Sequence, residues 1–193
     1  MSATPSFAGW RAAVLHRPDD GVERLVRQLA LLGIEADVRW TPLRRHAAFD
    51  LVLVDADQGW DGLLPWQPGE APAPVVALLG SEAPGRIAWA IDQGAGAFIA
   101  KPVVASAVYP ALVLAASIHA ERQAARRRAA ILEERLRLRP VVHGAVKAIM
   151  AAQGLDEDAA YRCLRRTAMR RRMTLEHVAA GIVAGQLPLP EAG

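Results

Sequence analysis

Short apolar runs alternate with amphipathic segments along the first hundred residues. Five of these runs have the length of β-strands and cover residues 12–15, 36–40, 51–54, 75–79 and 98–100. Residues 21–32 and 87–93, which lie between such runs, carry apolar side chains at the three- and four-residue spacing of a helix. Apolar strands that alternate with helices are typical of parallel sheets covered on both faces. We therefore predict an α/β domain with a doubly wound, five-stranded parallel sheet in the flavodoxin-like order.

The segment between the third and fourth predicted strands lacks a helical pattern. Residues 57–74 contain four prolines, three glycines and two tryptophans. Because proline and glycine disfavour a regular helix, we predict an irregular loop there, with at most one short helix. Residues 94–97 are expected to form a turn that leads into the fifth strand.

The chain changes character after about residue 106. Residues 109–139 are rich in alanine, leucine and arginine, which favour a helix. A heptad assignment places Ile118, Ala125 and Leu132 at position d. Position a is then held by Ala115, Arg122, Ala129 and Leu136. This seam predicts a short or irregular coiled coil between two copies of the chain. The alternative is one long helix that packs on its own domain.

Three short helices are expected after this stalk. Pro140 is predicted to end the stalk, and the helical segments that follow cover residues 141–152, 157–172 and 175–185. Gly154 separates the first two, and Asp156 and Thr174 are good N-cap residues for the second and third. The sequence therefore divides into an α/β domain, a helical stalk, a three-helix domain and a frayed tail, at residues 1–108, 109–139, 140–186 and 187–193.

Charge is distributed unevenly along the chain, whose net charge is +3. Residues 1–120 hold 9 Lys/Arg and 12 Asp/Glu, a net charge of −3, whereas residues 121–172 hold 14 Lys/Arg and 6 Asp/Glu, a net charge of +8. This segregation indicates a polyanion that binds only the C-terminal part. The alternative is an ordinary solvated helix face.

Composition also bears on where the protein works. No apolar run reaches the roughly 18–20 residues of a membrane span, and the first residues lack the basic start of a signal peptide. Cys163 is the single cysteine, so no disulfide can form within the chain, which fits a reducing cytoplasm. We expect a cytoplasmic protein that contacts no membrane and uses no metal or other cofactor.

The first half of the chain resembles the receiver domains of two-component response regulators. Asp55 ends the third predicted strand, where receivers carry the phosphoacceptor aspartate. Residues 74–80 (PVVALLG) are similar to their fourth strand, and residues 94–102 (GAGAFIAKP) to their Gly-Ala…Lys-Pro signature. The resemblance implies that Lys101 contacts the phosphoryl group and that Pro102 follows a cis peptide bond.

Two parts of a working phosphorylation site are missing from this pattern. Phosphoryl transfer to an aspartate requires Mg²⁺ held by neighbouring carboxylates. Receivers place an acidic pair directly after the first strand, but that position reads His16–Arg17, and Asp19 and Asp20 come only after a proline. The hydroxyl residue expected at the end of the fourth strand is replaced by Leu79. We therefore predict a degenerate receiver that phosphorylation does not control.

Asp55 and Lys101, which remain from the receiver pattern, have two interpretations. We predict an ion pair left at the carboxyl edge of the sheet. An active phosphoacceptor at Asp55 is the alternative.

Residues 141–184 resemble ANTAR, the small three-helix RNA-binding domain of antiterminators of the AmiR/NasT type. The resemblance is carried by positions on all three helices, namely Ala145, Ile149, Gly154, Tyr161, Leu164, Arg165, Ala168, Val178 and Ile182. The order of degenerate receiver, stalk and three helices also matches this family. One position departs from it: the family has Lys directly after the alanine of the first helix, where this chain has Val146 and then Lys147.

The second of these helices carries the densest group of basic residues. Arg162, Arg165 and Arg166 share a helix face, and Tyr161 borders it. Clustered arginines can bridge phosphates and stack on the bases of an RNA loop. For Tyr161, plain packing is the alternative, and Met150 and Met169 are expected in the core. The RNA-binding candidates are Lys147, Tyr161, Arg162, Arg165, Arg166, Arg170, Arg171 and Arg172.

These features together predict a dimeric RNA-binding transcription antiterminator that is not an enzyme. Two copies would pair through the stalk and bind hairpins in leader mRNA. The family resemblance implies control of the receiver-like domain by a ligand-sensing partner protein. Three other functions stay open: a response regulator controlled by phosphorylation at Asp55, a DNA-binding regulator with a helix-turn-helix, and a signalling adaptor that binds only proteins.

Overall fold

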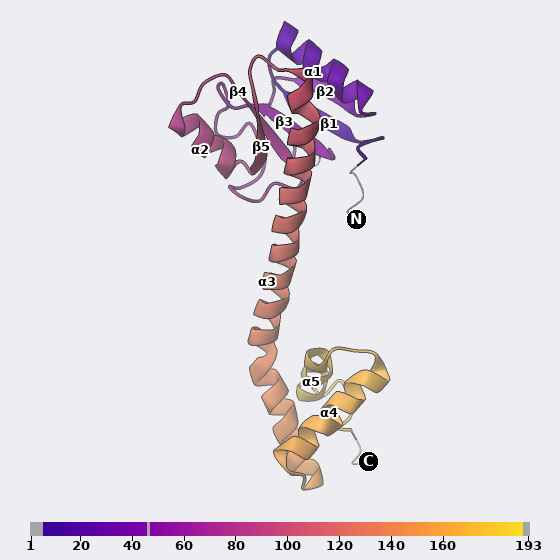
Figure 1. Cartoon of the computed structure of the whole chain (residues 1–193). Coiled ribbons are helices and arrows are strands. Elements are labelled where there is room, and N and C mark those ends of the chain that lie inside the picture. The colour runs from indigo at the N-terminus through magenta and orange to yellow at the C-terminus, as the bar shows by residue number, and fades with distance from the viewer. Residues whose placement is uncertain (1–5, 46, 191–193) are drawn as a thin grey trace. The chain divides into compact units, whose positions relative to one another are not determined.

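The computed structural model describes residues 6–45 and 47–190 (Figure 1). Contacts between residues divide the chain into two compact units, which cover residues 1–124 and 125–193. We call them the N-terminal unit and the C-terminal unit and describe each by itself.

The N-terminal unit contains a five-stranded parallel sheet. Its strands are β1 (Arg11–Leu15), β2 (Glu35–Arg39), β3 (Leu51–Asp55), β4 (Val75–Leu79) and β5 (Ala95–Ala100). They lie in the order β2-β1-β3-β4-β5, and every pairing is parallel. This order confirms the predicted doubly wound fold. Parallel strands bring their carboxyl ends to one edge, which is where open sheets of this class place their functional residues.

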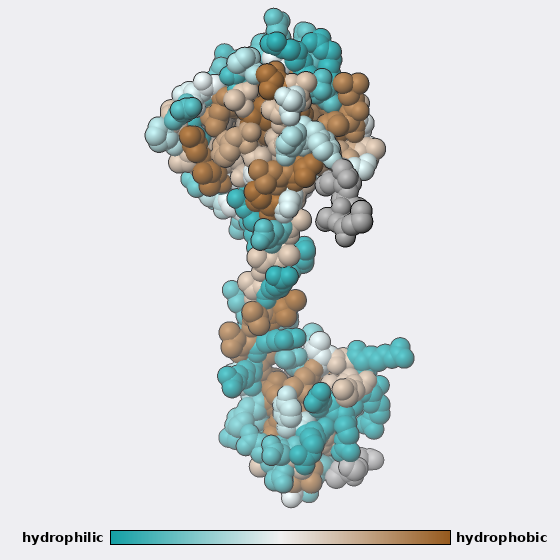
Figure 2. Space-filling view, in the orientation of Figure 1, coloured by the Kyte–Doolittle hydropathy of each residue, from teal (hydrophilic) through white to brown (hydrophobic). Residues whose placement is uncertain are grey.

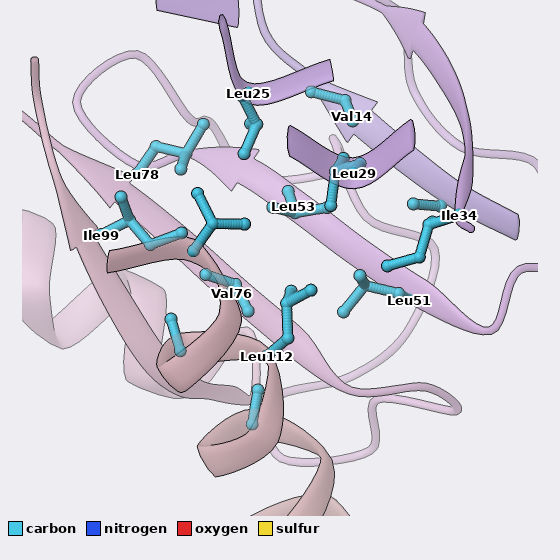
Figure 3. Packing of buried hydrophobic residues seen from close by; sticks show 14 of the residues in the cluster. Val14, Leu25, Leu29, Ile34, Leu51, Leu53, Val76, Leu78, Ile99 and Leu112 are labelled. Atoms are coloured by element: carbon cyan, nitrogen blue, oxygen red, sulfur yellow. The ribbon is translucent and has the colours of Figure 1, made fainter. Parts of the chain in front are cut away.

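Helices cover one face of this sheet. They are α1 (Asp20–Leu31) and the first turns of α3 (Ala105–Gln153). Alternate strand residues point to this face, as the two-residue period of a strand requires. Figure 3 shows Leu25 of α1 and Leu112 of α3 in the same cluster as Leu53 of β3.

The first turns of α3 approach the sheet closely at Gly96. A Cβ atom at this position would lie 3.0 Å from the Cα atom of Ala115 and 3.2 Å from its carbonyl oxygen. Glycine at 96 therefore permits the contact, and Ala115 is fully buried. Ala115, a predicted position a of the stalk, thus belongs to the core of its own unit.

The opposite face of the sheet is covered more by loops than by helices. The helix α2 (Pro84–Asp92) packs Ala90 there. Within the described residues no helix forms between β3 and β4, which confirms the predicted irregular loop. This loop and the one before β3 cover the sheet instead with Leu43, Leu63, Leu64, Trp40 and Trp66.

The elements α2 and β5 each begin three residues earlier than predicted. α2 starts at Pro84, because proline is well suited to the first turn of a helix. β5 starts at Ala95, where we expected a turn. Ala95 and Ala97 are buried and pair with Val75 and Val76 of β4, and the register shifts by one residue between these two pairs, opposite Gly96.

The C-terminal unit consists of three packed helical segments. They are the last turns of α3, together with α4 (Glu157–Arg171) and α5 (Leu175–Val183). Asp156 and Thr174 cap α4 and α5 by accepting backbone hydrogen bonds, as predicted. The buried core of this unit contains Ala145, Val146, Ile149, Ala160, Cys163, Leu164, Ala168, Val178, Ala179 and Ile182.

The predicted break at Pro140 is wrong, because α3 continues through it for a total of 49 residues. A proline removes one backbone donor and the hydrogen bond that it would make. Good helix formers precede Pro140, and Ala145 and Ile149 pack in the core after it, so the helix is held on both sides. The end of the stalk helix is therefore also the first helix of the three. Neither α3 nor any other helix in the described part of the chain is long and apolar enough to cross a membrane.

The prediction of a frayed tail is wrong for residues 187–190. Leu187 packs against the core, and its backbone N–H donates to the carbonyl of Gly181 at 2.9 Å. The side chain of Gln153 donates to the carbonyl of Pro190, which is buried. Residues 191–193 of the predicted tail lie outside the described residues.

The variant Leu112→Ala should lower the free energy of unfolding by about 2–5 kcal/mol, because it leaves a cavity at a fully buried position. Leu114→Ala, on the same helix but 52% exposed, should change it by less than about 0.5 kcal/mol. Chemical denaturation followed by circular dichroism measures both. Equal losses in the two variants would contradict the packing of α3 on the sheet.

Candidate functional site

The first candidate site lies at the carboxyl edge of the sheet. Asp55 is the last residue of β3 and is completely buried, and Lys101 directly follows β5. The Nζ atom of Lys101 lies 2.8 Å from Oδ1 of Asp55, so the two residues form an ion pair. The peptide bond between Lys101 and Pro102 is cis, as the receiver resemblance implies.

A third charged residue, Asp57, joins this pair, and the sequence analysis missed it. Its Oδ2 atom lies 2.7 Å from Nζ of Lys101 and accepts a hydrogen bond of 2.7 Å from the backbone N–H of Gly80. Its Oδ1 atom accepts a hydrogen bond of 3.1 Å from the backbone N–H of Ser81. The only sequence feature that could have marked Asp57 was its position on the loop after β3, two residues beyond Asp55. Nothing in the sequence showed that its side chain reaches the loop after β4.

His16 lies on the other side of Asp55. It follows β1, is buried, and places Nε2 3.4 Å from Oδ2 of Asp55. Its Nδ1 atom is 2.6 Å from the carbonyl oxygen of Arg17, which can only accept, so Nδ1 carries a proton. Oδ2 of Asp55 is buried and accepts no hydrogen bond from the described residues.

The residues around Asp55 do not fit the magnesium ion of a receiver. Mg²⁺ requires several oxygen ligands, but the position after β1 holds His16 and Arg17. The carboxylate of Asp19 instead caps α1, where it accepts a hydrogen bond of 2.8 Å from the backbone of Val22. In residues 6–45 and 47–190 no three or more His, Cys, Asp or Glu side chains come together as a metal site. The ammonium group of a lysine therefore neutralises the carboxylates here.

The contacts of Asp57 and Lys101 shift their pKa values in opposite directions. Burial alone raises the pKa of the Asp57 carboxyl, but hydrogen bonds from Lys101, Gly80 and Ser81 outweigh burial, so its pKa lies below the ordinary 3.8. Burial alone lowers the pKa of Lys101, but Asp55 and Asp57 outweigh it and raise the pKa above 10.5. Both groups are therefore charged at neutral pH.

The second candidate site is the exposed face of α4. Two adjacent rows at four-residue spacing form it: Tyr161, Arg165 and Met169, and beside them Arg162, Arg166 and Arg170. We call these six residues the arginine face. All six are exposed, and Figure 2 shows a largely hydrophilic surface over the C-terminal unit.

The prediction that Met169 lies in the core is wrong, because 66% of it is exposed. Its spacing of four from Arg165 places it in the exposed row, whereas the buried residues of α4 lie on the opposite side. Tyr161 is 43% exposed. A tyrosine and a methionine among guanidinium groups give this face apolar surface as well as positive charge. Such a surface can stack on bases and bind phosphates.

The other basic candidates lie outside the arginine face. Arg171 ends α4, and Arg172 caps it in the left-handed conformation, with φ of 54°. Lys147 is exposed on α3, next to the buried Val146. A lysine at 146 would place its charge in the core, and Lys147 projects about 100° away around the helix. Lys147 therefore does not present its charge on the helix face that position 146 occupies.

The two units follow each other in the order found in response regulators, in which a receiver precedes an effector unit. Comparison with known protein families agrees with this class. The family described as "AmiR, N-terminal" matches residues 10–116, and the ANTAR domain matches residues 130–183. The first match covers more than half of the chain, so this chain belongs to the AmiR family of ANTAR-domain regulators.

Individual relatives support the same assignment. Transcriptional regulatory protein PdtaR of Mycobacterium tuberculosis is 36% identical over 107 residues, which are 55% of this chain and 52% of that protein. The match thus spans about half the length of this relative. The aliphatic amidase regulator of Pseudomonas aeruginosa is 27% identical over 177 residues, or 90% of both chains. The solved structure of the response regulator StyR aligns with 92% of this chain and 100% of its own, with 19% identity and a TM-score of 0.53, which supports the fold.

Asp57 should stabilise the folded chain at neutral pH and lose this effect in acid. Its folded-state pKa lies below the unfolded-state value of about 3.8, so the unfolded chain binds protons first as the pH falls. The stabilisation is complete well above pH 3.8 and disappears as the pH falls from there through the lower folded-state pKa. Asp57→Asn should therefore unfold more easily at neutral pH and show a shallower loss of stability in acid.

Denaturant unfolding at a series of pH values measures this effect. Asp61→Asn removes an exposed carboxylate from the same loop and is the control. Identical pH profiles for Asp57→Asn and the wild-type chain would contradict the assigned contacts.

Proposed function

We propose that this chain is an RNA-binding transcription antiterminator that acts as a dimer in the cytoplasm, where it meets nascent mRNA. One observation carries the proposal: the ANTAR part of the chain presents the arginine face, with Tyr161 and Met169 exposed among four arginines. Proteins recognise RNA loops by stacking on splayed bases and by binding phosphates. The arginine face has side chains for both tasks.

The charge of the helices favours RNA over duplex DNA. A helix-turn-helix protein inserts its second helix into the major groove, where basic and polar side chains contact bases and phosphates. The helix that follows the arginine face is α5, which has Glu176 in its first turn and no lysine or arginine. Of these two helices, α4 and its end carry all the lysine and arginine residues, so the pair lacks a basic recognition helix.

Exposed apolar residues on α3 support a dimer. Ile131, Leu132 and Leu136 are 51%, 57% and 66% exposed, and Figure 2 shows hydrophobic surface on this helix. Leu132 and Leu136 are predicted positions d and a of the seam. Arg122, an earlier position a, donates a hydrogen bond of 2.9 Å to the carbonyl of Gly94 within the N-terminal unit. We therefore assign the contact between copies to the later heptads of α3.

Antitermination would result from binding that stabilises one of two alternative RNA structures. In the proposed dimer, two arginine faces bind hairpin loops in leader mRNA and stabilise a structure that excludes the terminator. RNA polymerase then continues into the operon. The protein catalyses no reaction and uses no cofactor in this scheme.

Control by a ligand-sensing partner protein is the other part of the proposal. The position of the acidic pair holds His16 and Arg17, and Asp57 engages the ammonium group of Lys101. These features support a receiver-like unit that works without phosphorylation at Asp55. The partner would bind the chain until an inducer appears.

The double variant Arg162→Ala, Arg165→Ala should weaken RNA binding several-fold or more, because it removes two guanidinium groups from the arginine face. An electrophoretic shift measures this with the leader RNA upstream of the neighbouring operon, at about 150 mM salt, where nonspecific binding is weak. Matching duplex DNA and a scrambled RNA serve as competitors.

Arg127→Ala with Arg128→Ala removes the same charge from exposed positions of α3 and should leave RNA affinity nearly unchanged. Equal losses in the two double variants would count against the arginine face. Preference of the wild-type chain for duplex DNA would replace the proposal with a DNA-binding regulator.

Leu132→Glu with Leu136→Glu should convert the dimer to a monomer, because a charge at each seam position opposes its burial. Analytical ultracentrifugation measures the mass in solution. Leu31→Glu places an acid at a 77% exposed leucine of α1 and should leave the dimer intact. A dimer that survives both seam substitutions would exclude this contact.

A further inference from the structure

We infer that Asp57 acts as a built-in substitute for a phosphoryl group. Its carboxylate occupies an anion cradle formed by the ammonium group of Lys101 and the backbone N–H groups of Gly80 and Ser81, and thereby holds the carboxyl edge of the sheet in one state. The inference rests on the part of the proposed function that makes the N-terminal unit independent of phosphorylation. It does not depend on RNA binding.

The cradle has the donors that an oxyanion requires. The three donors lie 2.7, 2.7 and 3.1 Å from the carboxylate oxygens of Asp57. Successive backbone N–H groups combined with an ammonium group form a common binding arrangement for phosphate oxygens. Here a carboxylate from the same chain satisfies all three donors.

The chain brings the cradle close to Asp57 from two elements. Gly80 and Ser81 lie on the loop after β4, and Lys101 follows β5, the strand that pairs with β4. A Cβ atom at Gly80 would lie 3.2 Å from Oδ2 of Asp57 and 3.5 Å from Cε of Lys101. The absence of a side chain at position 80 therefore lets the loop close over the carboxylate.

The backbone of Asp57 is fixed as well as its side chain. Its N–H donates a hydrogen bond of 3.0 Å to Oδ1 of Asp55, the same oxygen that Lys101 contacts at 2.8 Å. Asp55, Asp57 and Lys101 thus form one closed network. The backbone of Asp57 is bonded to Asp55, and its carboxylate is bonded to Lys101.

This arrangement opposes phosphorylation of Asp55. An incoming phosphoryl group needs donors for its oxygens and a cation to offset its charge. The cradle donors are already used by Asp57, and one ammonium group already serves two carboxylates. A phosphoryl group would have to displace Asp57 and would leave its carboxylate without the contacts that offset its partial burial.

The consequence is a loop after β4 that is held in place without modification. In a regulator that worked by phosphorylation, an anion that arrives from outside would be the switch. In this chain the anion is permanent, so the signal must act through another surface of the unit. A partner protein that binds the folded unit meets this requirement.

Asp57→Ala in the full-length chain tests the inference, with sulfate and inorganic phosphate as probes and no metal added. The empty cradle should bind either anion. The amide NMR signals of Gly80 and Ser81 should shift in a saturable way. The unfolding midpoint should also rise by at least about 2 °C above its value in chloride at the same ionic strength. The wild-type chain and the exposed-loop control Asp61→Ala should show neither response beyond the general effect of the salt.

Two further variants keep the test decisive. Adding Lys101→Ala to Asp57→Ala should abolish the response to both anions, because it removes the ammonium group of the cradle. If Asp57→Ala does not fold, Asp57→Asn provides a milder change that keeps one carbonyl acceptor, and its Gly80 and Ser81 signals should differ from those of the wild-type chain. Anion binding by the wild-type chain as strong as that of Asp57→Ala would overturn the inference. So would Gly80 and Ser81 signals that neither substitution changes.

A phosphodonor experiment separates this inference from the proposed function. Incubation of the wild-type chain with acetyl phosphate and Mg²⁺ should leave its intact mass unchanged. A mass gain that Asp55→Ala removes would overturn the phosphorylation-independent part of the proposed function, and with it the inference. An unmodified wild-type chain whose Asp57→Ala variant binds no anion would overturn the inference alone.

Discussion

A single helix, α3, supplies buried side chains to both compact units. Leu112 and Ala115 complete the core on one face of the sheet, and Ala145 and Ile149 complete the core of the C-terminal unit. The second contribution matters most, because a small helical unit such as residues 125–193 buries a smaller fraction of its surface than a larger domain does. The helix also has to satisfy a third demand, since its exposed leucines lie between these two buried stretches. One continuous helix therefore supplies the core of the N-terminal unit, the exposed leucines and the core of the C-terminal unit. A break at Pro140 would have removed its contribution to the C-terminal core.

At the carboxyl edge, a buried charge governs the arrangement. Asp55 is fully buried, and an unpaired carboxylate there would cost several kcal/mol. Lys101 offsets this cost and, together with the loop after β4, holds Asp57. A receiver fold can therefore lose the residues that bind a metal ion and still keep its most conspicuous aspartate, because the lysine gives that aspartate a structural role.

The sequence predicted the sheet well and the chemistry of its edge less completely. Apolar runs report burial on both faces, so the parallel order of the strands followed from the spacing of runs such as residues 51–54. Asp57 escaped notice because its importance depends on backbone N–H groups of another loop, which leave no trace in side-chain patterns. Asp55 and Lys101 are far apart in the sequence but were easier to place, because each lies in a short motif that the receiver pattern marks.

Three other predictions were wrong because they rested on residue types and not on the contacts made in the folded chain. The identity of a proline suggested a helix end, but packing of the residues after Pro140 outweighed the lost hydrogen bond. Hydrophobicity alone placed Met169 inside, although its spacing from Arg165 placed it outside. Residues 187–190 looked like a tail because the hydrogen bonds that hold them, from Leu187 to Gly181 and from Gln153 to Pro190, leave no pattern in the local sequence.

The continuity of α3 past Pro140 also restricts how this part of the chain can vary in length. Within the C-terminal unit, the segment between Leu136 and Ala145 sets the angular phase between the proposed contact of two copies and the core that supports α4. Insertion of one residue there would rotate the leucine seam by about 100° around the helix axis. Insertion of seven would restore it to within about 20°. Insertions and deletions between these positions should therefore be tolerated only in whole heptads. The number of residues between the seam and the core is constrained even where the identity of those residues is free to change.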